Sequence, residues 1–225
     1  IFDHPQYGMF VVRVAGNVLG TECLGSIDYA VQNIKSLKLV LVLGHSDCGA
    51  ATAAVNSYLS PHDFPELGLS HALRSLVDRL QIAVRGAEKS LERCCGTAFS
   101  ADPAYRKTLI EATIYINTAL TAFDVKNEIK NTNDEVEVVH GVYDVTDQRV
   151  RSLPRDGGES EGPLFGIIPT KAESLANYGD RVVCAIAERD GLPTLKAVPK
   201  TTKTKATIEA VRVSAKSNGR TRKTK

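Results

Sequence analysis

An unbroken apolar run, Leu39 to Leu43 (Leu-Val-Leu-Val-Leu), constrains the fold of this chain more than any other feature. Successive side chains of a β-strand point to opposite faces of the sheet, so a strand that is apolar at every position is expected to be buried on both faces. Such strands are typical of parallel sheets covered by helices. Gly44 ends the run, and the small apolar residues 49–55 then predict a helix. The sequence therefore predicts an α/β fold.

Two further segments, residues 10–14 and 136–145, have the β-branched character of strands. Residues 26–34 carry apolar side chains at helical spacing between the first two predicted strands. A strand, a helix and a second strand form a right-handed crossover unit, so we expect strands 10–14 and 39–43 to be parallel neighbours. The predicted fold class is a single α/β domain with a mainly parallel β-sheet flanked by helices.

Residues 60–130 form a predominantly helical middle, in which two apolar stripes at spacings of three and four predict two helices. The stripes consist of Leu69, Leu73, Leu76, Val77, Leu80 and Val84, and of Leu109, Ala112, Ile116, Leu120 and Phe123. Residues 96–103 connect the two helices. Gly, Pro and charged residues in the stretch 151–163 predict a loop, and residues 181–186 resemble one more strand.

The length of 225 residues is sufficient for one compact domain, which we place at residues 1–195. Residues 196–225 contain ten Lys or Arg and a single acid, Glu209, with few large apolar side chains. Such a segment cannot bury a core, so we expect a basic, disordered tail. The tail also lacks the aromatic residues on which bases stack, which argues against a nucleic-acid partner.

The composition is that of an ordinary soluble protein, with 43% hydrophobic and 24% charged residues. No apolar run approaches the length that crosses a membrane. Five cysteines at irregular spacing do not form a disulfide framework, which favours a reducing compartment, either cytoplasmic or organellar. Cys94 and Cys95 have no His or Cys at ligand spacing beside them, so we interpret them as a helix-end pair that is redox-sensitive if exposed.

The run 44–49, Gly-His-Ser-Asp-Cys-Gly, follows the end of the predicted strand and opens the next helix. In open α/β sheets this edge is where ligands bind. The imidazole of His45 and the thiol of Cys48 can reach one metal ion, and a helix N-terminus favours the thiolate that zinc requires. Taken alone, such a pair is more often a hydrogen-bonded loop histidine and a small buried cysteine.

Other residues near this turn are candidates for contact with a substrate. Gly49 allows close approach to the backbone, and the first N–H groups of the helix suit a small anion such as bicarbonate. Gly16 and Asn17 follow strand 10–14 and either shape the floor of a cleft or form a simple turn. Asp47 either orients a ligand or, as we favour, is a solvated turn residue at the helix start.

Four motifs, in order along the chain, resemble the β-class carbonic anhydrases. They are residues 10–17 (Phe-Val-Val-Arg-Val-Ala-Gly-Asn), residues 26–31 (Ser-Ile-Asp-Tyr-Ala-Val), residues 39–49, and residues 139–144 (Val-His-Gly-Val-Tyr-Asp). Four motifs in the family's order are far more specific than any one of them alone.

The resemblance implies a zinc enzyme that reversibly hydrates carbon dioxide to bicarbonate and a proton. The family holds zinc with Cys, His and Cys, and His45 and Cys48 match the second and third of these ligands. The first Cys opens a Cys-x-Asp-x-Arg motif whose Asp and Arg form the catalytic dyad. The resemblance places this motif just ahead of Ile1, so it assigns no catalytic residue within this sequence. It also implies a homo-dimer or a higher oligomer with active clefts at the subunit interface.

Two alternatives remain open at this point. A relative that hydrolyses carbon disulfide or carbonyl sulfide on the same site differs in the shape of its substrate tunnel, which the sequence does not separate. A catalytically inactive homologue would instead serve as a scaffold or binding subunit. Because two of three protein ligands lie in this sequence, we expect the 225-residue chain alone to bind zinc weakly and to hydrate carbon dioxide poorly.

Overall fold

The computed structural model describes residues 8–60, 62, 70–130, 132–154, 164–168 and 171–195. Its helices and strands follow in the order η1 (Ala15–Asn17), α1 (Thr21–Asn33), β1 (Leu39–His45), α2 (Gly49–Leu59), α4 (His71–Cys95), η3 (Thr97–Ala101), α5 (Tyr105–Ile129), β2 (Glu137–Asp144), β3 (Arg149–Arg151), β4 (Gly166–Ile167) and α6 (Ala172–Asp190). The predicted tail, residues 196–225, lies outside the described residues.

The sheet is built around β2. Strand β1 pairs with β2 in parallel, with Leu39 opposite Glu137 and His45 opposite Tyr143. Strands β3 and β4 both pair with β2 in the antiparallel direction. The predicted α/β fold is therefore confirmed, and the sheet is mixed because the chain turns back after β2 and pairs with it again.

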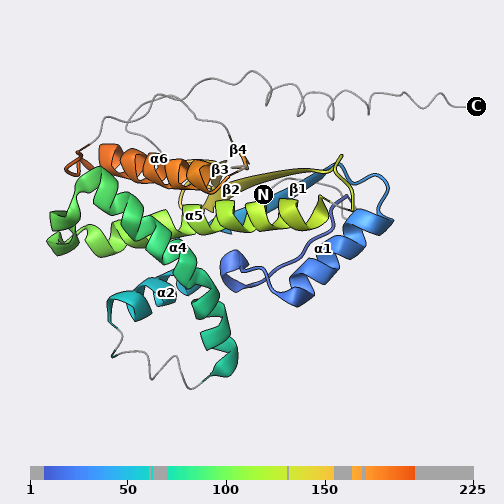
Figure 1. Ribbon diagram of the computed structural model, residues 1–225, viewed down its shortest axis with the longest axis horizontal. Helices are drawn as coiled ribbons and strands as arrows, with labels where there is room; N and C mark the ends of the chain where they lie inside the picture. Colours follow the sequence, from blue (N-terminus) through green and yellow to red (C-terminus); the bar gives the residue numbers. More distant parts are fainter. Residues whose placement is uncertain are drawn as a thin grey trace, which may run out of the picture.

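Helix α5 links the sheet to the other helices. It lies along β1 and β2 on one side and contacts α2, α4 and α6 on the other, so most of its length is buried. Figure 1 shows α5 running across the molecule along the strands, with α4 and α6 stacked beside it at one end and α1 at the other end. The main core lies among these stacked helices, and a smaller core lies between α5 and the sheet. The helices predicted in the middle of the chain are thus confirmed as α4 and α5.

The prediction that residues 10–14 form a strand beside residues 39–43 is wrong. The structure gives these residues no regular secondary structure, and Phe10 and Val11 are exposed. A β-branched run becomes a strand only when another strand accepts its hydrogen bonds, and within the described residues β1 pairs with β2 alone. As a result β1 is less buried than expected, with Leu39 47% exposed.

The strand-like run 181–186 is also not a strand, because it lies in the middle of α6. Val182, Val183 and Ile186 are fully buried there against the neighbouring helices α4 and α5. A helix buried on more than one side is apolar around much of its circumference, so its sequence resembles a buried strand.

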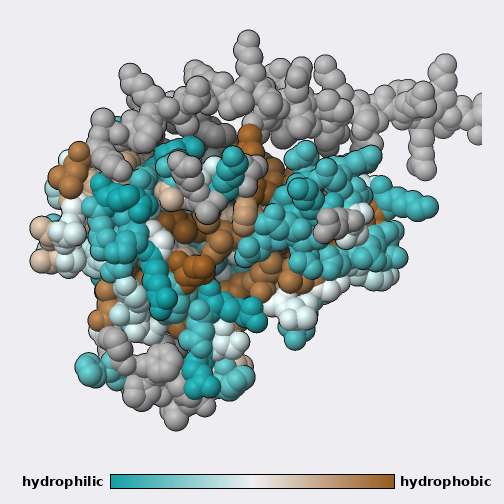
Figure 2. Space-filling model, in the orientation of Figure 1, coloured by the Kyte–Doolittle hydropathy of each residue, from teal (hydrophilic) through white to brown (hydrophobic). Residues whose placement is uncertain are grey.

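Figure 2 shows apolar residues exposed in the middle of this face, with hydrophilic residues covering its right side. Large apolar side chains that are exposed in the structure include Met9, Phe10, Val11, Val14, Tyr29 and Leu39. They belong to the N-terminal segment, α1 and the start of β1. None of the helices in the described part of the chain is long and apolar enough to cross a membrane.

Candidate metal site

The candidate ligands His45 and Cys48 lie on either side of a tight turn at the carboxyl end of β1. His45 is the last residue of the strand, and Cys48 directly precedes the first helical residue of α2. Asp47, between them, has a positive φ of 56°, a conformation that Asp tolerates better than most residues. The structure thus places Asp47 as an exposed turn residue next to the N-terminus of α2.

This turn is fastened to the end of β2. The backbone N–H of Ser46 donates to the carbonyl oxygen of Tyr143 at 2.9 Å. In return, the N–H of Val145 donates to the Ser46 hydroxyl oxygen at 2.9 Å. Hydrogen bonds in both directions hold the turn at a fixed position relative to the sheet.

The two candidate ligands differ in their surroundings. The ring of His45 is exposed, with Nδ1 2.8 Å from the carbonyl oxygen of Ser46. When Nδ1 carries the proton it donates to that oxygen, and Nε2 keeps the lone pair that binds a metal. Cys48 is only 5% exposed and belongs to the main core. That both side chains point at one metal ion stays a prediction.

The donor set fits zinc in kind. An imidazole nitrogen and a thiolate sulfur are ligands that Zn²⁺ prefers, and a zinc site takes four positions. Among the described residues, no group of three or more His, Cys, Asp or Glu side chains is placed to hold a metal ion. If the prediction holds, His45 and Cys48 would supply two of these four positions.

The substrate-adjacent candidates Gly16 and Gly49 are brought to the same neighbourhood. Gly16 has a φ of 64°, which favours glycine, and a Cβ built on it would lie 3.0 Å from the Cβ of Ala50. The short helix η1 therefore lies against the first turn of α2, which begins at Gly49.

Asn17, the last residue of η1, is held from the opposite side by α5. The side-chain amide of Asn117 donates to the carbonyl oxygen of Gly16 at 2.8 Å and to Asn17 Oδ1 at 3.3 Å. Thr121 Oγ1 donates to the carbonyl oxygen of Asn17 at 3.1 Å. The Nδ2 atom of Asn17 is buried and has no hydrogen-bond partner within the described ranges.

Sequence reasoning missed Asn117 and the neighbouring Thr118. Both are buried polar residues inside the apolar helix α5, and that combination is the signal that could have identified them. Thr118 lies against the last residues of β1, because a Cβ built on Gly44 would overlap its hydroxyl oxygen. Gly44 is therefore required for the close approach of β1 and α5 just before His45.

Replacing Gly44 with alanine should lower the free energy of unfolding by about 1–3 kcal/mol, because the added methyl group overpacks the contact with Thr118. Urea unfolding of the two proteins measures this difference. Gly25→Ala is the matched control: Gly25 is a helical residue with open space around it, so alanine there should raise stability by up to about 1 kcal/mol. In a Thr118→Ala background, Gly44→Ala should lower the free energy of unfolding by less. If Gly44→Ala in the wild-type background does not destabilise the protein relative to the Gly25→Ala control, the contact is contradicted.

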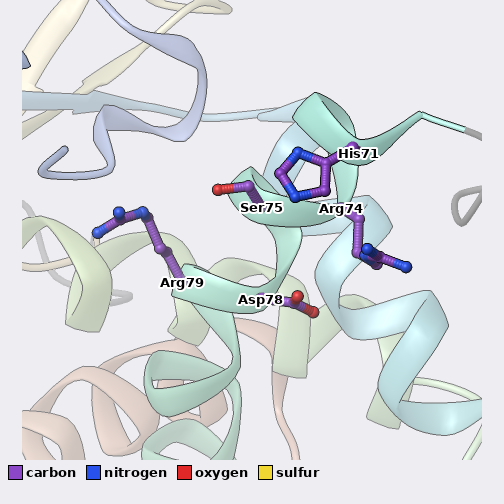
Figure 3. A pocket seen from close by; sticks show the side chains of 5 residues that line it. All are labelled: His71, Arg74, Ser75, Asp78 and Arg79. Carbon is purple, nitrogen blue, oxygen red and sulfur yellow. The ribbon is translucent and has the colours of Figure 1, made fainter.

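An open groove lies on another part of the surface. It has a volume of about 410 Å³ and is lined by His71, Arg74, Ser75, Asp78 and Arg79 of α4. Figure 3 shows Arg74 and Arg79 pointing to opposite sides of the helix, and Arg79 donates to the carbonyl oxygen of Leu19 at 3.0 Å. The two guanidinium groups point apart and do not form a shared site for one anion.

Comparisons with known proteins identify the family of this chain. Residues 1–150 match the family model described as carbonic anhydrase. A 55-residue stretch is 51% identical to carbonic anhydrase 2 of Mycobacterium tuberculosis, covering 24% of this chain and 26% of that protein. An 80-residue stretch is 41% identical to a carbonic anhydrase of Mycolicibacterium smegmatis, covering 36% of each chain. The matched stretches thus span between a quarter and about a third of these curated relatives.

Among solved structures, the β-carbonic anhydrase CcaA has 17% sequence identity and a TM-score of 0.43 over 63% of this chain and 66% of that one. The strand, turn and helix that carry His45 and Cys48 define an α/β protein with a candidate metal site at the end of a parallel strand pair. With the family model matching residues 1–150, the chain belongs to the carbonic anhydrase family. The family predicted from the four motifs is confirmed.

Proposed function

We propose that this protein is a zinc-dependent enzyme that reversibly hydrates carbon dioxide to bicarbonate and a proton. The observation that carries the proposal is the turn between β1 and α2 in a member of the carbonic anhydrase family, with His45 on one side and Cys48 on the other. Bound zinc lowers the pKa of a water molecule toward about 7 and so supplies hydroxide near neutral pH.

The residues of this chain would prepare the site for that chemistry. His45 would bind through Nε2, with its ring oriented by the contact between Nδ1 and the Ser46 carbonyl. Cys48, at the N-terminus of α2, would bind through its sulfur atom. The backbone N–H groups of Gly49 and Ala50, at the same helix N-terminus, suit the negative charge of bicarbonate.

The neighbouring helix η1 would form one wall of the substrate site. Gly16 approaches α2 closely because it lacks a side chain, and Asn117 and Thr121 fix the η1 backbone from α5. As the resemblance implies, we expect a homo-dimer or a higher oligomer, and a reducing compartment that keeps Cys48 as a free thiol.

The test is a stopped-flow hydration assay combined with zinc analysis of the purified protein. It compares the 225-residue chain with a version that includes any residues encoded ahead of Ile1, where the resemblance places a third ligand and an Asp–Arg dyad. We expect zinc and rapid hydration in the extended version and little of either in the short chain. Zinc binding without hydration of carbon dioxide would favour the inactive homologue. Rapid hydrolysis of carbonyl sulfide without hydration of carbon dioxide would favour the alternative substrate.

A further inference from the structure

Two buried thiols meet where helices α4 and α6 pack together. Cys94 lies in the last turn of α4 and Cys184 in the second half of α6, 90 positions apart in the sequence. Their sulfur atoms are 3.2 Å apart, and the two residues are 0% and 1% exposed. A disulfide has a sulfur–sulfur distance of about 2.05 Å, so an approach of about 1 Å, within the range of small side-chain rotations, would bring the sulfurs to bonding distance.

The packing of the two helices fixes this distance. A Cβ built on Gly179 would lie 2.5 Å from the hydroxyl oxygen of Ser90, so the helices approach as closely as glycine permits. One residue further along α6, Asp180 accepts hydrogen bonds from Nε and Nη2 of Arg93, at 2.9 and 2.6 Å. Arg93 directly precedes Cys94, and Asp180 precedes Cys184 by one helical turn. The thiols are therefore held together by a glycine contact and an ion pair.

The end of α6 and the segment that follows it are also attached around this contact. Arg189, in the last turn of α6, donates through Nη1 and Nη2 to the carboxylate of Glu111 on α5, at 2.7 Å each. The chain then returns to α4, where the N–H of Leu195 donates to the carbonyl oxygen of Cys94 at 2.6 Å. A covalent bond between Cys94 and Cys184 would thus join two helices that already pack side by side in a fixed position.

We propose that Cys94 and Cys184 are a disulfide-forming pair, which a thiol oxidant such as hydrogen peroxide or oxidised glutathione converts into a covalent link between α4 and α6. With oxidised glutathione, one protein thiolate attacks the disulfide and releases one reduced glutathione. The second protein thiol then attacks the mixed disulfide and releases the other. The two protein thiols lose two electrons and two protons, and one molecule of oxidised glutathione becomes two of reduced glutathione. This inference does not depend on the proposed enzymatic function.

Burial sets the conditions under which the pair reacts. It raises the pKa of the Cys94 thiol, so little of the reactive thiolate forms in the closed structure. Oxidation should therefore proceed through local opening of α6 and be slower than modification of the partly exposed Cys23. Urea below its unfolding midpoint should accelerate it. Once formed, the bond restricts the unfolded chain and should raise the thermal midpoint by about 5–15 °C.

Peptide mapping of the oxidised 225-residue chain tests the proposal directly. The protein is treated with oxidised glutathione in dilute urea, its remaining thiols are alkylated, and it is digested with trypsin without reductant. Cleavage after Arg and Lys yields the peptides 94–106 and 182–189, and we expect them linked to each other. Dithiothreitol should separate them and reverse the rise in thermal midpoint.

Cys95 provides the matched control, since it is a buried neighbour on the same peptide. Cys95→Ser should retain the linked peptides and the higher thermal midpoint, whereas Cys94→Ser and Cys184→Ser should lose both. If either of the latter variants fails to fold, the linked mass in wild type and in Cys95→Ser still decides. The proposal is overturned if oxidised wild type yields no linked pair, or if the link persists in Cys94→Ser and vanishes in Cys95→Ser.

Discussion

Replacing Cys48 with alanine is expected to remove bound zinc and to lower the rate of carbon dioxide hydration by more than about 100-fold. Loss of a residue that only orients a ligand typically costs 10–100-fold in affinity or activity, and loss of a ligand itself should cost more. Cys48 is the one thiol at the start of α2, and its replacement leaves His45 as the remaining candidate ligand in this turn.

Zinc content per protein and hydration kinetics measure this effect on the version that includes any upstream residues. Cys23→Ala is the control, because Cys23 lies on α1 and is a free thiol outside the candidate site. The control should keep both zinc and activity. Stoichiometric zinc retained in Cys48→Ala would contradict the assignment of Cys48.

Acid is expected to destabilise the folded protein through His140, in the middle of β2. The ring is fully buried, and neither nitrogen has a hydrogen-bond partner of normal geometry in the described part of the chain. It packs edge-on against the ring of Tyr178 at a centroid distance of 5.1 Å. On its other side, a Cβ on Gly166 would overlap the imidazole. Burial disfavours the charged ring and nearby Arg181 repels it, and together they outweigh the contact with the Ile167 backbone, which favours the charged form.

Burial lowers the pKa of His140 from the ordinary 6.5 to about 4 in the folded protein. Between these pH values the unfolded chain binds more protons than the folded one, so the free energy of unfolding falls as the pH decreases from 6.5 toward 4. The total loss is up to about 3 kcal/mol, at 1.36 kcal/mol per pKa unit. Above pH 6.5 this residue should contribute no pH dependence.

Urea unfolding of metal-free protein at several pH values between 4 and 8 measures this slope without interference from zinc. His140→Leu should reduce the pH dependence in this range even if its stability at pH 8 is lower. His71→Gln, at an exposed position on α4, should leave the slope unchanged. An equal slope in wild type and His140→Leu would show that other groups cause the acid sensitivity.

The elements that could be predicted from the sequence are those whose pattern is local. The apolar run before His45, the small residues of α2 and the long stripes of α4 and α5 each specify their own element by periodicity. The two wrong predictions, residues 10–14 and 181–186, are both β-branched runs. Whether such a run becomes a strand, a helix or neither depends on the partner that packs against it, which periodicity does not reveal.

The candidate site likewise has a part that local sequence specifies and a part that depends on packing between distant segments. The order of His45, Cys48 and Gly49 along one turn could be read from the sequence, as could their position after a strand. The contacts of Thr118 with Gly44 and of Asn117 with η1 could not be read from the sequence. Each joins two residues that are far apart along the chain, by 74 and 101 positions, and depends on how α5 packs in the folded protein. The proximity of Cys94 and Cys184 was hidden for the same reason.

Helix α5 contacts more of the residues around the candidate site than any other single helix described above. Through Thr118 and Asn117 it positions both segments that border the candidate metal site. Through Glu111 it holds the end of α6. Substitutions on its buried polar face should therefore disturb the site more than their distance from His45 in the sequence suggests.

X-ray absorption at the zinc edge, on zinc-loaded protein that includes any upstream residues, measures the ligands of the metal directly. We expect sulfur neighbours at about 2.3 Å and nitrogen at about 2.0–2.1 Å, with the outer scattering of an imidazole that disappears in His45→Gln. A zinc spectrum with oxygen neighbours alone, or one unchanged by His45→Gln, would contradict the assignment of His45 and Cys48 as zinc ligands.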